Sequence, residues 1–191
     1  MVAYMTMNFK LYKHVIFDFD ETLAKLIVDW PFWHKEIIPI IKKYDASFDE
    51  NTYLNMYSIH QLINKYGENF RSDYVNFEIA TEKKYYRGYK LIEKSFDLLQ
   101  ELHEQNKKLY LLTSNCREVV LPILEELKIA DYFSKIVTVD DVKNLKPTPE
   151  PFKLIASEPC DKSEFLMIGD SKSDSEFAQN VGIDYLDVSE F

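Results

Sequence analysis

Two aspartates directly follow an apolar stretch near the start of the sequence. Val15, Ile16 and Phe17 form a run without polar alternation, which is typical of a strand buried on both faces of a parallel sheet. Asp18 and Asp20 come next, and because residues two apart point to the same side of an extended chain, their carboxylates are expected to converge. Two such charges repel each other unless a cation or a shared proton lies between them. The pair therefore predicts a site for a divalent cation that prefers oxygen ligands, such as Mg²⁺.

A hydroxyl residue ends a second apolar run. Thr113 follows residues 109–112 directly, and Ser114 and Asn115 come after it. A hydroxyl and backbone amides at the carboxyl end of a parallel strand can hold a phosphoryl oxygen. The same residues could instead cap the next helix, and Ser114 is a second choice to Thr113 for the phosphate-binding hydroxyl.

A third apolar run ends in glycine and acid. Residues 165–168 are followed by Gly169 and Asp170, and Asp174 lies one helical turn further on. Glycine allows the backbone to pass close to a site, Asp170 can reach a metal, and Asp174 can anchor that metal or orient its waters. Asp170 or Ser171 could also serve as the cap of the following helix.

Lys146 is placed in a stiff, proline-rich segment. Pro147 and Pro149 flank Thr148, so the backbone around the lysine has little freedom. The lysine is therefore presented in a nearly fixed position. Taken alone, the segment would also suit a solvated lysine in a surface loop.

These four segments, in this order, resemble the four motifs of the haloacid dehalogenase (HAD) superfamily. The resemblance is to its phosphatases, such as the phosphoglycolate phosphatase-like members that carry a helical cap. It implies an Mg²⁺-dependent phosphatase that hydrolyses a small phosphate monoester through an aspartyl-phosphate on Asp18, with Asp20 as the general acid and base. Glu21 departs from the pattern, because many relatives have glycine there, and this difference bears on substrate size. The resemblance implies catalytic roles for Asp18, Asp20, Thr113 and Lys146, substrate binding by Ser114, Asn115 and Lys146, and metal binding by Asp18, Asp20, Asp170 and Asp174.

Three other functions are compatible with parts of this pattern. A sugar-phosphate mutase would have every motif and would pass the phosphoryl group to a second hydroxyl instead of water. A metal-free 2-haloacid dehalogenase would need neither a leaving-group acid nor the aspartates at 170 and 174. A non-catalytic binding protein on the same fold usually lacks one of the motif acids, and none is absent here.

The composition narrows the range of partners. The chain has 191 residues, of which 46% are hydrophobic, and 23 basic residues against 32 acidic ones give a net charge of −9. Such a surface repels nucleic acid, whereas a small phosphorylated metabolite can still be attracted by a metal and a local lysine. No apolar run approaches the ~20 residues of a membrane span and no signal pattern opens the chain, so a cytoplasmic location without membrane association is expected. The oligomeric state is not predicted.

The elements that must position these residues follow an α/β rhythm. Strands and helices alternate from about residue 87 onward, which predicts a parallel sheet with right-handed crossovers. The expected fold is a three-layer, Rossmann-like α/β core formed by residues 1–23 and 87–191. Residues 24–86 show helical spacing and no buried strand, so they are expected to form an inserted all-helical cap domain.

Details of the insertion are predicted as well. Pro39 is expected to kink or divide a helix that begins near Asp29. Residues 47–50 read as a capping box that begins the next helix, and Gly67 is expected to end that helix. Gly88 is expected to separate two helices.

Overall fold

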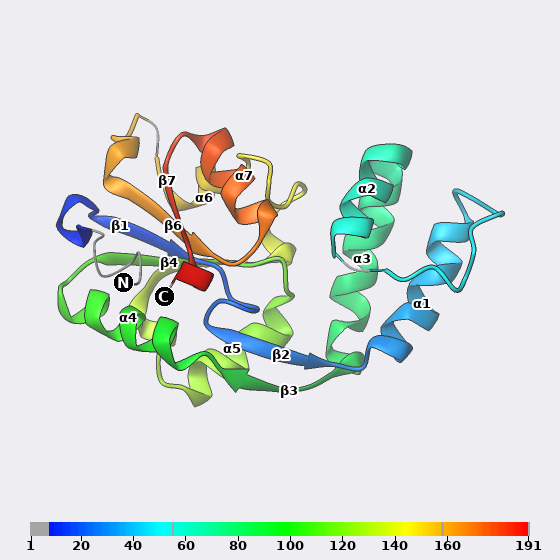
Figure 1. Cartoon of the computed structure of the whole chain (residues 1–191), viewed down its shortest axis with the longest axis horizontal. Helices are drawn as coiled ribbons and strands as arrows, with labels where there is room; N and C mark the ends of the chain where they lie inside the picture. The colour runs from blue at the N-terminus through cyan, green and yellow to red at the C-terminus, as the bar shows by residue number, and fades with distance from the viewer. Residues whose placement is uncertain (1–7, 55, 158, 191) are drawn as a thin grey trace. The chain divides into compact units, whose positions relative to one another are not determined.

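The chain divides into two compact units (Figure 1). The computed structural model describes residues 8–54, 56–157 and 159–190. One unit, the core unit, contains the described residues up to Leu26 and those from Tyr89 onward, and the other, the helical unit, is Ile27–Gly88. These divisions lie a few residues after the boundaries expected at 23/24 and 86/87. The reason is that two strands, β2 (Ala24–Val28) and β3 (Tyr86–Leu91), run across the divisions and pair with each other.

A five-stranded parallel sheet forms the centre of the core unit. Its strands are β1 (His14–Phe17), β4 (Lys108–Leu112), β5 (Phe133–Val137), β6 (Phe165–Gly169) and β7 (Asp184–Asp187). They are arranged in the order β5-β4-β1-β6-β7, and every neighbouring pair is parallel. The predicted parallel sheet is therefore confirmed, and β1 is its central strand.

Helices cover both faces of this sheet. Helices α4 (Glu93–Glu104) and α5 (Arg117–Glu126) lie on one face, and α6 (Phe152–Ile155) and α7 (Lys172–Val181) lie on the other (Figure 1). Because all βαβ crossovers bring helices onto the sheet, each strand must present apolar side chains to both layers. This arrangement confirms the predicted three-layer α/β fold.

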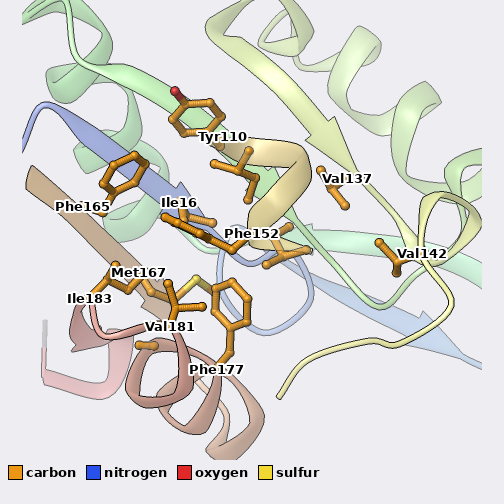
Figure 2. Packing of buried hydrophobic residues seen from close by; sticks show 13 residues of the cluster. Ile16, Tyr110, Val137, Val142, Phe152, Phe165, Met167, Phe177, Val181 and Ile183 are labelled. Atoms are coloured by element: carbon orange, nitrogen blue, oxygen red, sulfur yellow. The ribbon is translucent and has the colours of Figure 1, made fainter. Parts of the chain in front are cut away.

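Apolar side chains from the strands form a core cluster on the sheet face under α6 and α7. Ile16 and Met167 point from adjacent strands into a cluster that also contains Phe152 of α6 and Phe177 of α7 (Figure 2). Ile16, Met167 and Phe177 are completely buried. Each side chain of this kind contributes about 1.5–3 kcal/mol by leaving water. The cluster therefore fixes the strands whose ends carry the polar residues described below.

The helical unit consists of three helices around its own apolar cluster. They are α1 (Trp30–Lys42), α2 (Met56–Tyr66) and α3 (Glu68–Tyr85). Asp29 caps α1 by accepting a hydrogen bond from the Phe32 amide at 3.1 Å. The buried residues of this cluster are Trp33, Ile37, Ile38, Ile41, Leu54, Ile59, Phe70, Tyr74, Phe77 and Tyr85.

A buried carboxyl group links two of these helices. Glu78 of α3 accepts hydrogen bonds from Trp33 Nε1 of α1, at 3.0 Å, and from the Tyr85 hydroxyl. Burial raises the pKa of Glu78 above its usual value, although these hydrogen bonds act in the opposite direction. The group therefore holds its proton to a higher pH in the folded unit than in the unfolded chain.

The prediction that residues 24–86 are all helical, without a buried strand, is wrong at the partly buried strand β2. Residues 26–28 of β2 form an apolar run as long as 15–17, but only Ala24 and Leu26 are buried and they alternate with more exposed residues, so β2 is not buried on both faces as the sheet strands are. β3 has no fully buried residue. It contains Gly88, whose φ is +136°, so Gly88 lies within a strand and not between two helices.

Three helix positions can be compared with the sequence prediction. Pro39 is expected from the sequence to kink or divide α1, and it does not divide it, since α1 continues through it to Lys42. Proline has no amide hydrogen, so the carbonyl of Lys35 has no helical donor at Pro39. Both residues are exposed, so water can donate to that carbonyl instead. Ser47 does not begin a helix, because its hydroxyl donates to Asp45 Oδ1 at 2.6 Å and the next helix begins at Met56. Gly67 ends α2 as predicted and has a φ of +78°.

Within the described part of the chain, none of the helices is both long enough and apolar enough to cross a lipid bilayer.

Candidate active site

Three polar segments meet at the carboxyl edge of the sheet. Phe17, the last residue of β1, lies opposite Leu111 of β4 and Ile168 of β6. Asp18 continues this pairing, since its amide donates to the Ile168 carbonyl at 2.9 Å. Asp18, Thr113 and Asp170 thus follow three neighbouring strands at the same edge, as the motif order predicts.

Lys146 lies at the centre of this edge and is almost completely buried. Its Nζ donates to Asp18 Oδ1 at 2.7 Å, to Asp174 Oδ1 at 2.6 Å and to the Leu112 carbonyl at 3.1 Å. Burial alone would lower the pKa of Lys146, but the carboxylates of Asp174 and Asp18 outweigh it and raise that pKa. Lys146 therefore remains an ammonium ion in contact with Asp18.

Three carboxylates form a compact group beside this lysine. One oxygen each from Asp18, Asp170 and Asp174 lies within 4.8 Å of the others. Burial, followed by repulsion from Asp174, raises the pKa of Asp18 despite the contact with Lys146. The same two causes raise the pKa of Asp170 to about 6. The group thus carries more negative charge than one ammonium ion balances.

This group matches the requirements of a divalent cation. Carboxylate oxygens are the ligands that Mg²⁺ prefers, and a second cation would offset the charge that raises these pKa values. Gly169 allows the close approach, because a Cβ atom there would lie 2.5 Å from Asp174 Cγ. The residues present therefore fit Mg²⁺.

Asp20 lies apart from the three-carboxylate group. Its Oδ1 accepts hydrogen bonds from the Leu26 amide at 2.7 Å and from the Glu21 amide at 3.1 Å. Burial raises the pKa of Asp20 to about 6, even though these hydrogen bonds favour the charged form. A carboxyl group with this pKa can both give and accept a proton near neutral pH.

The two hydroxyl residues in the loop after β4, Thr113 and Ser114, differ in burial. Thr113 is buried, and its hydroxyl donates to Asn115 Oδ1 at 2.8 Å and accepts from the Asn115 amide at 3.1 Å. Ser114 is half-buried. The hydroxyl of Thr113 is thus held in place by its own loop, which preorganises the turn at the strand end.

Two supporting residues were not among the predicted site residues. The Thr22 hydroxyl donates to Asp170 Oδ1 at 3.3 Å, and Thr22 has no solvent exposure. Ser171 caps α7 and donates to Asp174 Oδ2 at 2.5 Å. Sequence spacing gives a signal for each, since Thr22 lies in the first acidic motif and Ser171 precedes Asp174 by three residues, as in a capping box.

Glu21 lies in the left-handed region with a φ of +56°, a conformation that suits glycine better than glutamate. Its side chain and Asp170 line the same cleft of the core unit, which has a volume of about 560 Å³. Glu21 also forms an exposed ion pair with Lys25 at 2.6 Å. The residue that departs from the family pattern therefore shares a cleft with one carboxylate of the group.

Comparison with known proteins identifies a family for this chain. The family model for haloacid dehalogenase-like hydrolases matches residues 15–188. A phosphoglycolate phosphatase of Salmonella paratyphi A is 41% identical over 87 residues, which cover 45% of this chain and 34% of that protein. The pyrophosphatase PpaX of Halalkalibacterium halodurans is 33% identical over 111 residues, which cover 55% of this chain and 52% of that protein. The matches thus span between a third and about half the length of these two relatives.

A solved structure shows the same fold at low sequence identity. The structure from Bacteroides fragilis, described as a haloacid dehalogenase-like hydrolase, superposes with a TM-score of 0.64 and 21% identity. The superposition covers 94% of this chain and 88% of that chain. With the family match over nearly the whole described sequence, the chain belongs to the haloacid dehalogenase-like hydrolase family.

Proposed function

We propose that this chain is an Mg²⁺-dependent phosphatase that hydrolyses a small phosphate monoester through an aspartyl-phosphate on Asp18. The observation that carries the proposal is the buried Lys146 ammonium, which contacts Asp18 and Asp174 beside the carboxylate of Asp170. A purely structural ion pair would need neither the third carboxylate nor the acid at Asp20. Electrostatic positioning of this kind is the main requirement of phosphoryl transfer.

The proposed reaction has two steps. A carboxylate oxygen of Asp18 forms a bond to phosphorus while the bond between phosphorus and the leaving oxygen breaks, and Asp20 gives its proton to that oxygen. A water oxygen then forms a bond to phosphorus while the bond between phosphorus and the Asp18 oxygen breaks, and Asp20 takes a proton from the water. This step releases inorganic phosphate and restores the Asp18 carboxylate. Lys146 and the loop at Thr113, with Ser114 and Asn115, bind the phosphoryl oxygens.

Mg²⁺ would be held by Asp18, Asp170 and Asp174 together with the backbone carbonyl of Asp20. When bound, the ion neutralises negative charge on the phosphoryl oxygens. The carboxylate of Asp20 remains available for proton transfer, since it lies outside the three-carboxylate group and has a pKa of about 6.

We further propose that residues 24–86 form a cap domain that sets substrate choice, with residues 1–23 and 87–191 as the catalytic core domain. The helical unit packs around its own cluster, and the Asp29 amide donates to the Tyr85 carbonyl at 2.8 Å where the unit begins and ends. Residues 30–84 can therefore be replaced by a short linker with little strain. The shortened protein should hydrolyse a generic aryl phosphate while discriminating less among other esters; an unchanged substrate ranking would contradict this role.

The catalytic proposal is tested by phosphate release with Mg²⁺ from p-nitrophenyl phosphate, phosphoglycolate and inorganic pyrophosphate. The last two are included because the relatives are named for them. Asp18→Asn should abolish turnover, whereas Asp97→Asn, an exposed change on α4, should leave it unchanged. Wild-type turnover in Asp18→Asn would refute the assignment of Asp18 as the nucleophile. Transfer of the phosphoryl group to a second sugar hydroxyl would identify a mutase instead, and halide release from a 2-haloacid in chelator would identify a dehalogenase.

A further inference from the structure

Tyr185 contacts the backbone immediately before Asp170. It lies on β7, and its hydroxyl donates to the carbonyl of Gly169, the last residue of β6, at 3.1 Å. The ring is partly buried and packs against the apolar cluster under α7. Burial, followed by the nearby carboxylates of Asp187 and Asp174, raises the pKa of Tyr185, so its hydroxyl keeps its proton and remains a donor.

The Gly169 carbonyl belongs to the peptide unit that leads into Asp170. Because a peptide unit is planar and rigid, the direction of this carbonyl fixes where the Asp170 Cα begins. The Asp170 carboxylate accepts a hydrogen bond from the Thr22 hydroxyl at the long distance of 3.3 Å, and it also interacts with its own backbone amide, which belongs to this same peptide unit. The backbone before Asp170 must therefore supply much of the orientation of its carboxylate.

We propose that Tyr185 is a positioning residue that orients Asp170 for metal binding through its hydrogen bond to the Gly169 carbonyl. This inference rests on the metal-dependent function proposed above. Partners that hydrogen-bond a metal ligand directly change metal affinity by about 10–100-fold when they are removed. Tyr185 acts through one peptide unit instead, so the loss of its hydroxyl should weaken metal binding by roughly 3–10-fold.

Tyr12, which precedes β1, provides a matched control because it also hydrogen-bonds to β7. Its hydroxyl donates to Asp184 Oδ2, on the first residue of β7, at 2.8 Å. The variants Tyr12→Phe and Tyr185→Phe each remove one hydroxyl group and one hydrogen bond that joins β7 to another segment of the core unit. Only Tyr185→Phe removes a contact to the backbone that leads into Asp170.

The test is direct binding of Mn²⁺ to the full chain, measured by electron paramagnetic resonance of the free ion and reversed by competition with Mg²⁺. Thermal unfolding of the same samples in chelator gives the structural cost of each change. Tyr185→Phe should raise the Kd for Mn²⁺ by about 3–10-fold, while Tyr12→Phe should stay within about twofold of wild type, with similar decreases in Tm for both. Binding measured in this way does not depend on turnover.

Each other outcome overturns a different statement. An unchanged Kd in Tyr185→Phe, or equal changes in both variants, would refute the positioning role and leave the proposed function intact. If the wild-type chain does not bind Mn²⁺, the metal dependence of the proposed function is refuted, and the positioning role of Tyr185 is refuted as well.

Discussion

Removing the ammonium group of Lys146 should destabilise the core unit strongly. Lys146→Met leaves the carboxylates of Asp18 and Asp174 facing each other in a site where all three side chains are nearly or completely buried. Breaking a buried ion pair by removing one partner costs about 3–5 kcal/mol. We therefore expect the free energy of unfolding to decrease by that amount in the presence of chelator.

Lys107→Met is the matched control. The Lys107 ammonium donates to the carbonyls of Phe9 and Tyr12 at 2.8 and 2.6 Å, so its loss removes charged hydrogen bonds but leaves no carboxylate unpaired. The expected cost is about 1.5–3 kcal/mol. The clearer distinction is the response to Mg²⁺, because an ion at 100 times its Kd adds about 2.7 kcal/mol to the folded state. With its unbalanced carboxylates, Lys146→Met should regain more stability in Mg²⁺ than wild type or Lys107→Met does.

The assay must report on the core unit itself. Both tryptophans of the chain, Trp30 and Trp33, belong to the helical unit, so their fluorescence does not follow unfolding of the sheet. Urea unfolding should therefore be followed by hydrogen exchange of the amides in β1 and β4. A cost below about 1 kcal/mol for Lys146→Met, or the same response to Mg²⁺ as Lys107→Met, would refute the reasoning from a buried, over-charged carboxylate group.

Three further predictions concern single residues. Gly169→Ala should lower stability by about 1–3 kcal/mol and reduce activity, because the new Cβ would lie 2.5 Å from Asp174 Cγ; an active variant with wild-type Tm would contradict this. Asp170→Asn should raise the Mg²⁺ concentration for half-activity with little loss of Tm, since Asp170 is exposed, whereas Asp174→Asn should also lower Tm because it weakens the bond to the buried lysine. Glu78 has a raised pKa, so the folded helical unit holds a proton that the unfolded chain releases above about pH 4.5, and stability is lost as the pH rises through that raised pKa. Tryptophan fluorescence in urea should therefore show Glu78→Gln gaining stability relative to wild type as the pH rises above about 4.5, and parallel pH curves would count against it.

The sheet could be predicted from sequence because its strands are buried on both faces. Continuous apolar runs such as 15–17, 109–112 and 165–168 are typical of such strands, and the structure contains β1, β4 and β6 there. β2 and β3 are not strands of this kind. β3 has no such run, and β2 has an apolar run at residues 26–28 but alternates buried and more exposed residues. Their strand geometry depends on the pairing between them, which is a contact between distant segments.

The candidate site, too, could be predicted from sequence only in part. Residue types and motif order were sufficient to select Asp18, Lys146 and Asp170 and to expect them at one edge of the sheet. Spacing did not reveal that Lys146 also bonds Asp174, because that contact depends on how the loop before α6 folds against α7. Nor did it reveal Tyr185, whose role depends on the register of β6 and β7.

The paired strands β2 and β3 also determine how much the insertion costs the core. The Ile92 amide donates to the Leu23 carbonyl at 3.0 Å, so the two ends of the core chain are already held together where the insertion leaves and returns. The entropy of closing such a loop grows only with the logarithm of its length, and doubling the length adds about 0.6 kcal/mol. Segments of very different size and sequence could therefore occupy this position at nearly the same cost to the sheet. A fold with this property can change its inserted segment freely while the residues at the strand ends stay in place.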